Sequence, residues 1–251
     1  MRGFRRRYDF IWILILVLSI SGCSTTKKKK DSSPDVLFNK AMSYYNDKKY
    51  DKALIAFQKL KDNYPLSKYS ITAELRIADS YYRDKKYTDA VFHYEDFRKL
   101  HPTNTEVPYV LYQIGMCHFN RISPIDRDQT FTEKAAVHFE YLVSKYPSET
   151  HSIFAKDKLR TCNEKLVSHE FYVGHLYFKT KKYKAALIRF NGIIERFPDS
   201  SEIDKIYLYI AKSYISLKEK EKAKDALIHL TKEHPKSKYT SKALKILSKL
   251  K

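Results

Sequence analysis

The sequence is poor in residues that interrupt regular structure. Its 251 residues include only 5 Gly and 8 Pro, against 21 Tyr and 14 Phe. Glycine and proline break helices most strongly, whereas aromatic side chains can fill a core. The composition therefore argues against a disordered chain and favours long helices around a well-filled core. The length suits one or two ordinary domains.

Motifs that support catalysis or metal binding are also lacking. The 9 His residues are scattered, with no His-Glu-x-x-His motif and no Cys–His spacing typical of zinc sites. Neither a Gly-rich phosphate loop nor a Gly-x-Ser-x-Gly nucleophile elbow occurs. We therefore expect a protein that is not an enzyme and that holds no metal or small-molecule cofactor.

Acidic residues are fewer than basic ones. The chain has 29 Asp and Glu against 48 Lys and Arg, which gives a formal net charge of +19. Such an excess is typical of proteins with acidic partners, anionic lipids or nucleic acid. The lysines are spread along the whole chain, however, so solvated helix faces explain the charge at least as well. Charge alone does not choose between these interpretations.

The first 22 residues have the pattern of an export signal. Four arginines precede an apolar run over residues 10–18, and Ile20-Ser21-Gly22-Cys23 ends the segment. The run is marginal for a membrane span, which needs about 20 residues, and it fits a signal peptide over residues 1–22. The last four residues resemble the lipobox of bacterial lipoproteins, in which Cys23 carries the lipid. An uncleaved membrane helix is the alternative.

A polar segment over residues 23–34 follows the predicted cleavage site. It begins with the predicted lipidated Cys23 and contains four successive lysines, so it fits a flexible tether next to anionic headgroups. Ser24 replaces the Asp that retains bacterial lipoproteins at the inner membrane, which favours the outer membrane. Cys117 and Cys162 lie in apolar helical stretches. They fit two small buried hydrophobes, although an oxidising compartment would also permit a disulfide.

Five segments share one pattern that ends in an aromatic residue or His before Pro. The prolines are Pro65, Pro102, Pro147, Pro198 and Pro235, and the Ala residues twelve positions earlier are Ala53, Ala90, Ala135, Ala186 and Ala223. Bulky apolar residues lie eight and five positions before each Pro. This i, i+4, i+7 spacing predicts a helix with one apolar face, which the Pro ends.

A second helix is predicted upstream of each of these segments. In four units a Tyr lies nine residues before the Ala and a small residue twelve before it: Ala41, Ala78, Gly174 and Ala211. Small residues allow two antiparallel helices to approach closely. Because one hairpin cannot bury its own apolar face, successive hairpins must stack.

The pattern resembles the tetratricopeptide repeat (TPR). It implies an all-α fold, an α-solenoid of five TPR-like helical hairpins with a C-terminal capping helix. The predicted repeats span about 35–68, 72–105, 109–149, 168–201 and 205–238, and the cap spans 239–251, so the TPR domain covers residues 35–251.

Two irregularities interrupt the repeat register. In the third repeat Gly115 lies twenty residues before Ala135, so an insert is expected around residues 121–128. Additional helix is expected at about 152–165, ahead of the fourth repeat. The insert leads into the next helix through Asp126-Arg127-Asp128-Gln129-Thr130.

The lipobox, the five repeats, the insert and the lengthened helix together resemble the BamD family, the TPR lipoproteins of the outer-membrane barrel-assembly machinery. An Arg-Asp-Gln or Arg-Asp-Pro step into the helix after the insert is typical of that family. The Pro-x-Ser-x-Tyr segments that begin at Pro65 and Pro235 also match its hairpin exits.

The resemblance implies a lipid-anchored protein on the periplasmic face of the outer membrane. Its implied partners are the POTRA domains of a BamA-like insertase, other assembly lipoproteins, unfolded outer-membrane β-barrel proteins and outer-membrane lipid. Nucleic acid is not expected, because export separates the chain from it. The alternative is a generic periplasmic TPR scaffold that coordinates cell-envelope or division complexes.

The first helices of the first three repeats should present an apolar, aromatic surface. The residues predicted there are Phe38, Met42, Tyr45, Leu75, Tyr82, Tyr112, Met116 and Phe119, with Arg76, Arg83 and Arg121 nearby. Such a surface suits an extended peptide that ends in an aromatic residue with a free carboxylate. This chemistry is that of the terminal strand of an outer-membrane barrel, the substrate signal attributed to the family. Packing of the aromatics between repeats or against the insert is the alternative.

The fourth and fifth repeats are expected to have a more polar inner face, with His175, Lys205 and Lys212. In the family this end docks on the insertase. Arg189 falls where the family carries a partner-contacting Arg, and it should point away from the hairpin core. The alternative is a solvated surface arginine.

Overall fold

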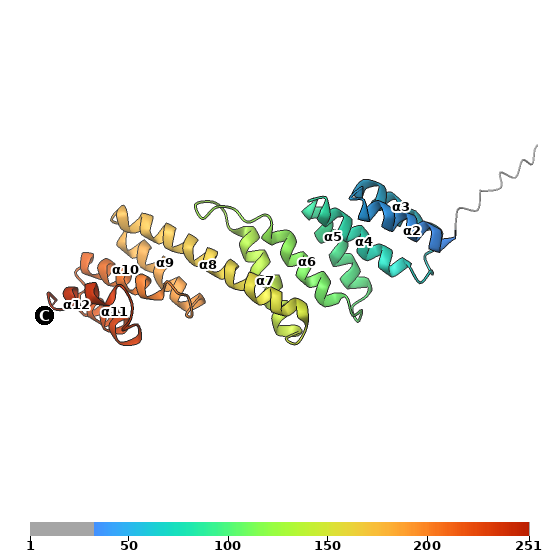
Figure 1. Cartoon of the computed structure of the whole chain (residues 1–251). Helices are drawn as coiled ribbons and strands as arrows, with labels where there is room; N and C mark the ends of the chain where they lie inside the picture. Colours follow the sequence, from blue (N-terminus) through green and yellow to red (C-terminus); the bar gives the residue numbers. More distant parts are fainter. Residues whose placement is uncertain (1–32, 251) are drawn as a thin grey trace, which may run out of the picture.

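The computed structural model describes residues 33–250, and these residues form eleven α-helices and no strand (Figure 1). The hairpins are α2 (Pro34–Asn46) with α3 (Tyr50–Asn63), α4 (Ser70–Arg83) with α5 (Tyr87–Leu100), α6 (Val107–Phe119) with α7 (Thr130–Lys145), α8 (Thr150–Lys179) with α9 (Tyr183–Arg196), and α10 (Ile203–Ser216) with α11 (Lys220–Glu233). Helix α12 (Thr240–Leu247) follows. The predicted all-α solenoid of TPR-like hairpins is confirmed. The predicted signal peptide, Cys23 and most of the tether lie outside the described residues.

The second helix of every hairpin ends two residues before the repeat proline, and the residue between them has a non-helical backbone. At Tyr64, for example, φ is -140° and ψ is 59°, and its N–H donates to Leu60 O. The residue before a proline is disfavoured in the helical region, because the proline ring collides with its backbone. The same backbone conformation recurs before the other four prolines.

Small residues on the first helices let the paired helices approach. A Cβ added to Gly115 on α6 would lie 2.5 Å from Phe139 of α7, and one added to Gly174 on α8 would lie 2.6 Å from Phe190 of α9. Such distances are far below van der Waals contact. Glycine at these two positions is therefore required by the aromatic ring that packs against it.

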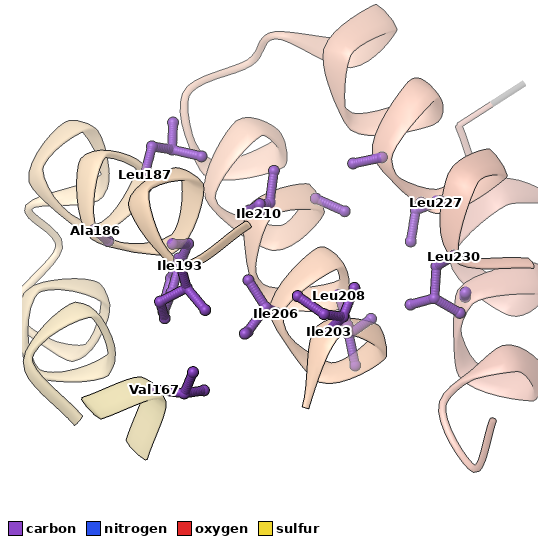
Figure 2. Close-up of a cluster of buried hydrophobic side chains, with 14 residues drawn as sticks. Val167, Ala186, Leu187, Ile193, Ile203, Ile206, Leu208, Ile210, Leu227 and Leu230 are labelled. Carbon is purple, nitrogen blue, oxygen red and sulfur yellow. The ribbon is translucent and has the colours of Figure 1, made fainter. Parts of the chain in front are cut away.

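The core consists of four clusters of buried side chains along the solenoid. Figure 2 shows the C-terminal cluster, in which Ile206 and Leu208 of α10 lie between α9 and α11. Phe197 packs against this cluster and also against its neighbour around α6, α7 and α8. The cores are therefore continuous from one hairpin to the next, as stacked repeats require.

The insert between α6 and α7 is tied to its surroundings by polar contacts. Buried Gln129 donates to Pro124 O at 2.8 Å and to Arg127 O at 2.9 Å. Asp128 accepts from the Thr130 backbone N–H at 3.0 Å, which satisfies a free donor at the start of α7. His169 Nδ1 of α8 lies 2.6 Å from Ile125 O, so the insert also contacts the long helix.

Helix α8 is one continuous helix of 30 residues. The additional helix expected at 152–165 is its N-terminal half. Ala155 and Cys162 of that half belong to the core cluster of α7, and Val167 of the C-terminal half belongs to the core cluster of α9. Helix α12 buries Ala243 and lays Ile246 and Leu247 against the C-terminal core, as a cap does. Among the helices of residues 33–250, none is both long and apolar enough to cross a membrane.

Candidate functional site

The first helices α2, α4 and α6 carry the residues predicted for peptide binding. On α2, Phe38 and Met42 are half-buried against the core of the first hairpin. The Phe38 ring stacks on Tyr69 with 4.6 Å between centroids, and Tyr45 meets Tyr50 edge-on at 5.8 Å. These rings are thus held by neighbouring helices but keep part of their surface open to solvent.

Arg83 at the end of α4 reaches back to the first hairpin. Its interaction with the Tyr45 side chain raises the pKa of Arg83, while burial raises the pKa of Tyr45. Tyr82 meets Tyr87 edge-on at 5.7 Å and accepts a hydrogen bond from Asn120 at 3.1 Å. The structure therefore brings Tyr45 and Arg83 together, while Tyr82 turns toward the third repeat.

Leu75 does not lie where the sequence analysis places it. Only 5% of its surface is exposed, and it belongs to the core cluster that contains Val110 and Ile114 of α6. The next hairpin covers this position, so Leu75 stabilises the stack of repeats and is not available to a peptide. This part of the prediction is wrong.

The third repeat adds a further aromatic group. Tyr112 lies 5.8 Å from the His151 ring and 6.4 Å from the Phe154 ring of α8. Phe119 meets Phe139 edge-on at 6.2 Å, and Lys158 Nζ lies 5.0 Å from the Phe119 ring. Both predicted residues are half-buried. The exposed Phe154, which the sequence analysis did not include, extends this surface onto α8.

A buried carboxylate at the centre of this region was missed from the sequence. Asp79 of α4 is 1% exposed, and its Oδ1 accepts hydrogen bonds from Tyr94 and Tyr109, each at 2.6 Å. Its other oxygen is paired with Arg76. Burial, followed by the charge of Asp79, raises the pKa of Tyr109 and holds its phenol protonated. An Asp at an otherwise apolar face of a repeat helix was the available signal.

Arg76 lies between the Asp79 network and the surface of the protein. One third of its side chain is exposed, its Nε has no hydrogen-bond partner, and its guanidinium lies 6.0 Å from the Tyr45 ring. Two guanidinium groups, Arg76 and Arg83, therefore flank Tyr45. Arginine forks bind carboxylates by paired hydrogen bonds, so the arrangement can hold an anionic group beside aromatic surface. We call these three residues the arginine–tyrosine site.

Arg121 is not part of this site. Its guanidinium lies 3.8 Å from the Phe131 ring and donates to Thr88 Oγ1 at 3.2 Å. It therefore holds the insert against α5 and α7. Cys117 and Cys162 are free, buried thiols in different core clusters, and burial raises the pKa of each to about 12. Neither thiol is set up as a nucleophile.

The inner face of the fourth and fifth repeats is more aromatic than expected. Phe171 stacks on His175 at 5.7 Å, and Tyr209 meets Phe171 edge-on at 5.2 Å. The predicted Lys205 and Lys212 lie above these rings. The three predicted polar residues lie on this face, and the register of α8 and α10 adds the rings of Phe171 and Tyr209 beneath the lysines.

Arg189 on α9 is exposed, as predicted, and pairs with Glu170 of α8 at 3.1 Å. This pair spans the two helices of its hairpin. Among residues 33–250, no cluster of His, Cys, Asp or Glu is placed to hold a metal ion.

Comparison with known proteins identifies one family over most of the chain. Residues 30–228 match the YfiO family, described as "Outer membrane lipoprotein". The outer membrane protein assembly factor BamD of Rickettsia prowazekii is 29% identical over 94% of both chains. BamD of Caulobacter vibrioides is 24% identical over 84% of this chain and 71% of that one, and BamD of Neisseria gonorrhoeae is 26% identical over 91% and 92%. A solved tetratricopeptide repeat protein of Parabacteroides merdae is 17% identical over 98% and 95%, with a TM-score of 0.43.

Proposed function

Because this chain belongs to the BamD family of outer-membrane protein assembly factors, a family without enzyme activity, we propose that it is the TPR scaffold of a barrel-assembly machine. In this role it binds unfolded outer-membrane β-barrel proteins through its N-terminal repeats and the POTRA region of a BamA-like insertase through its C-terminal repeats. Family membership associates the chain with the outer membrane. Lipid attachment at Cys23 and a position on the periplasmic face are parts of the proposal.

The arginine–tyrosine site is the observation that carries the substrate-binding part. Arg83 interacts with the Tyr45 side chain, and one third of the Arg76 side chain is exposed. A barrel strand that ends in an aromatic residue offers a carboxylate for the guanidinium groups and a ring for the aromatic surface. The half-buried rings of Phe38, Tyr82, Tyr112 and Phe119 extend apolar contact along the first helices.

Binding of a labelled barrel C-terminal peptide to the purified chain tests this proposal. We expect the Tyr45→Ala, Tyr82→Ala double variant to bind more weakly by about tenfold, because two ring contacts are lost. The matched control is Tyr141→Ala with Tyr172→Ala, since these tyrosines are exposed outside the site. The same peptide with a C-terminal amide should also bind weakly. Equal affinity of both double variants contradicts the proposed site.

Docking on the insertase is proposed to involve Arg189. Its ion pair with Glu170 is exposed enough to exchange for a partner carboxylate, since surface pairs contribute only about 0–1 kcal/mol. Arg189→Glu should reduce co-purification of the insertase from detergent-solubilised outer membranes, whereas Glu170→Gln should retain it. Full co-purification of the Arg189→Glu variant would argue against this contact. A barrel protein with POTRA domains should co-purify with the unaltered chain if this function is correct, and should be absent if the chain is a generic envelope scaffold.

Lipid attachment is tested separately. Metabolic labelling with palmitate should mark the full chain, and Cys23→Ala should abolish the label and release the protein from membranes. Two or more acyl chains give stable membrane attachment. Retention of label in Cys23→Ala would place the anchor elsewhere.

A further inference from the structure

The inner face of the fourth and fifth repeats carries a cationic surface over an aromatic floor. Lys205 Nζ lies 3.9 Å from the Phe171 ring centroid, and Lys212 Nζ lies 4.4 Å from that of Tyr209. His175 stacks on Phe171 and meets Tyr209 edge-on at 5.2 Å. The five side chains come from α8 and α10 and all are half-buried. We call them the lysine–aromatic surface.

Positive charge at this surface exceeds the negative charge beside it. Lys205 pairs with Glu202 at 2.5 Å, but among residues 33–250 no carboxylate lies within ion-pair distance of Lys212. Burial, and then the charge of Lys242 on α12, lower the pKa of Lys212. The fold thus holds an ammonium group in a partly desolvated place next to another cation.

The pKa of His175 reflects the same excess of positive charge. Its pKa is lowered by burial and then by three lysines: Lys179, Lys205 and Lys212. Like charges that lower one another's proton affinity also raise the affinity of the surface for an anion, because a bound carboxylate relieves their repulsion. The rings below provide apolar contact between the charges. This combination favours a ligand that alternates carboxylates with apolar side chains.

We propose that the lysine–aromatic surface is a further protein-binding site, separate from Arg189 on α9, and that it takes an acidic segment of a partner protein. Carboxylates of the segment pair with Lys205 and Lys212, and an apolar side chain between them lies on the Phe171 and Tyr209 rings. None of these residues belongs to the arginine–tyrosine site at the other end of the solenoid, so this site is independent of the proposed substrate site.

A peptide fits this surface better than an anionic bilayer does. The rings are half-buried between α8 and α10, so a flat membrane could reach the lysine ammonium groups but not the floor. A single peptide side chain is small enough to contact both. Binding to the charges alone would be weak and would disappear at high salt, whereas ring contacts retain part of the affinity.

The experiment measures binding of a fluorescent acidic peptide, in which Asp and Glu alternate with Phe and Leu, to the full chain. The comparison peptide has Asn and Gln in place of the acids. We expect the acidic peptide to bind at least about tenfold more tightly, since charge-assisted hydrogen bonds are the stronger class. Equal binding of the two peptides would overturn the proposal.

Variants then locate the site. Lys205→Gln with Lys212→Gln should weaken binding by about tenfold or more, and Lys205→Arg with Lys212→Arg should retain it. The matched control is Lys184→Gln with Lys232→Gln, which removes two exposed lysines from α9 and α11. Equal loss in the control would mean non-specific charge and would overturn the site. Far-UV circular dichroism verifies that each variant is folded.

Two further measurements separate this proposal from others. Vesicles of anionic phospholipid should not displace the acidic peptide, and displacement would assign the surface to lipid instead. The barrel C-terminal peptide should bind the Lys205→Gln, Lys212→Gln variant normally. If that peptide fails to bind even the unaltered chain, the substrate proposal fails while the acidic-segment proposal is unaffected.

Discussion

A lysine occupies the left-handed backbone region in four of the hairpin turns. The φ angles are 60° at Lys48, 61° at Lys85, 60° at Lys181 and 63° at Lys218. In the third hairpin the insert replaces this turn. A side chain with a Cβ is strained at such angles by about 1 kcal/mol or more. The short turn nevertheless allows the two helices to pair closely, so packing of the hairpin holds the strained residue in place.

Glycine at such a turn should stabilise the fold. Lys48→Gly removes the Cβ strain and should raise the free energy of unfolding by about 0.5–1 kcal/mol after the entropy of the freer unfolded chain is subtracted. Urea denaturation measures this change. Lys52→Gly, in the first turn of α3, should instead lower stability by up to about 1 kcal/mol. A loss of stability in Lys48→Gly would contradict the strain argument.

Acid should destabilise the protein through a buried histidine. His118 is 7% exposed and its Nδ1 has no hydrogen-bond partner. Burial, followed by the nearby His138, Lys134 and Arg121, lowers the pKa of His118 from 6.5 to about 4. Between those pH values the unfolded chain binds the proton more readily than the folded chain. The stability that neutral, buried His118 contributes is therefore fully present above pH 6.5 and is lost as the pH falls toward 4.

The size of this acid effect follows from the pKa difference. The shift corresponds to about 3–3.5 kcal/mol at its full extent. His118→Leu removes the titrating group. Between about pH 7 and about pH 4.5, which spans most of the interval between the two pKa values, the stability of this variant should fall less than that of the unaltered chain. Urea denaturation at both pH values measures the difference. Identical pH slopes in the two proteins would show that His118 is not responsible.

At the scale of helices, close approach depends on a few small residues. Gly115→Ala and Gly174→Ala place a methyl group against Phe139 and Phe190, and overpacking of this kind costs about 1–3 kcal/mol. Gly192→Ala is the matched control, because nothing lies within 4 Å of its added Cβ. It should raise stability by about 0.8–1 kcal/mol through helix propensity. The melting temperature should thus fall in Gly115→Ala and Gly174→Ala and rise in Gly192→Ala. A higher melting temperature in Gly115→Ala would contradict the packing account.

Helix positions were predictable because their causes are local. The spacing from Ala53 to Pro65, repeated along the chain, specifies an apolar face and a stop within one helix. The burial of Leu75 and the network of Asp79 depend instead on how far each hairpin is rotated against the next. That rotation results from packing between repeats, and no periodicity within one helix encodes it. The aromatic floor beneath Lys205 was missed for the same reason.

At the scale of the molecule, the solenoid is an open chain of cores rather than one core. Each of the four clusters contacts only its neighbours, so stability is approximately a sum of local terms and coupling terms. The arginine–tyrosine site lies on α2 and α4, and the lysine–aromatic surface lies on α10 and the C-terminal half of α8. That helix therefore sets the distance and orientation between whatever binds at each end.

A break in α8 should uncouple the two halves of the molecule. Asn163 lies in the middle of this helix, between the core around α7 and the C-terminal core. Asn163→Pro removes a helical hydrogen bond and costs about 3 kcal/mol, leaving the Phe197 packing as a link between the two cores. We expect urea unfolding, monitored by hydrogen exchange, to split into two transitions, one for each half of the molecule. Thr150→Pro is the control: Thr150 is the first residue of α8, and Glu149 before it has a ψ of 143°, which a following proline accepts. A single transition in Asn163→Pro would mean that contacts other than the helix couple the repeats.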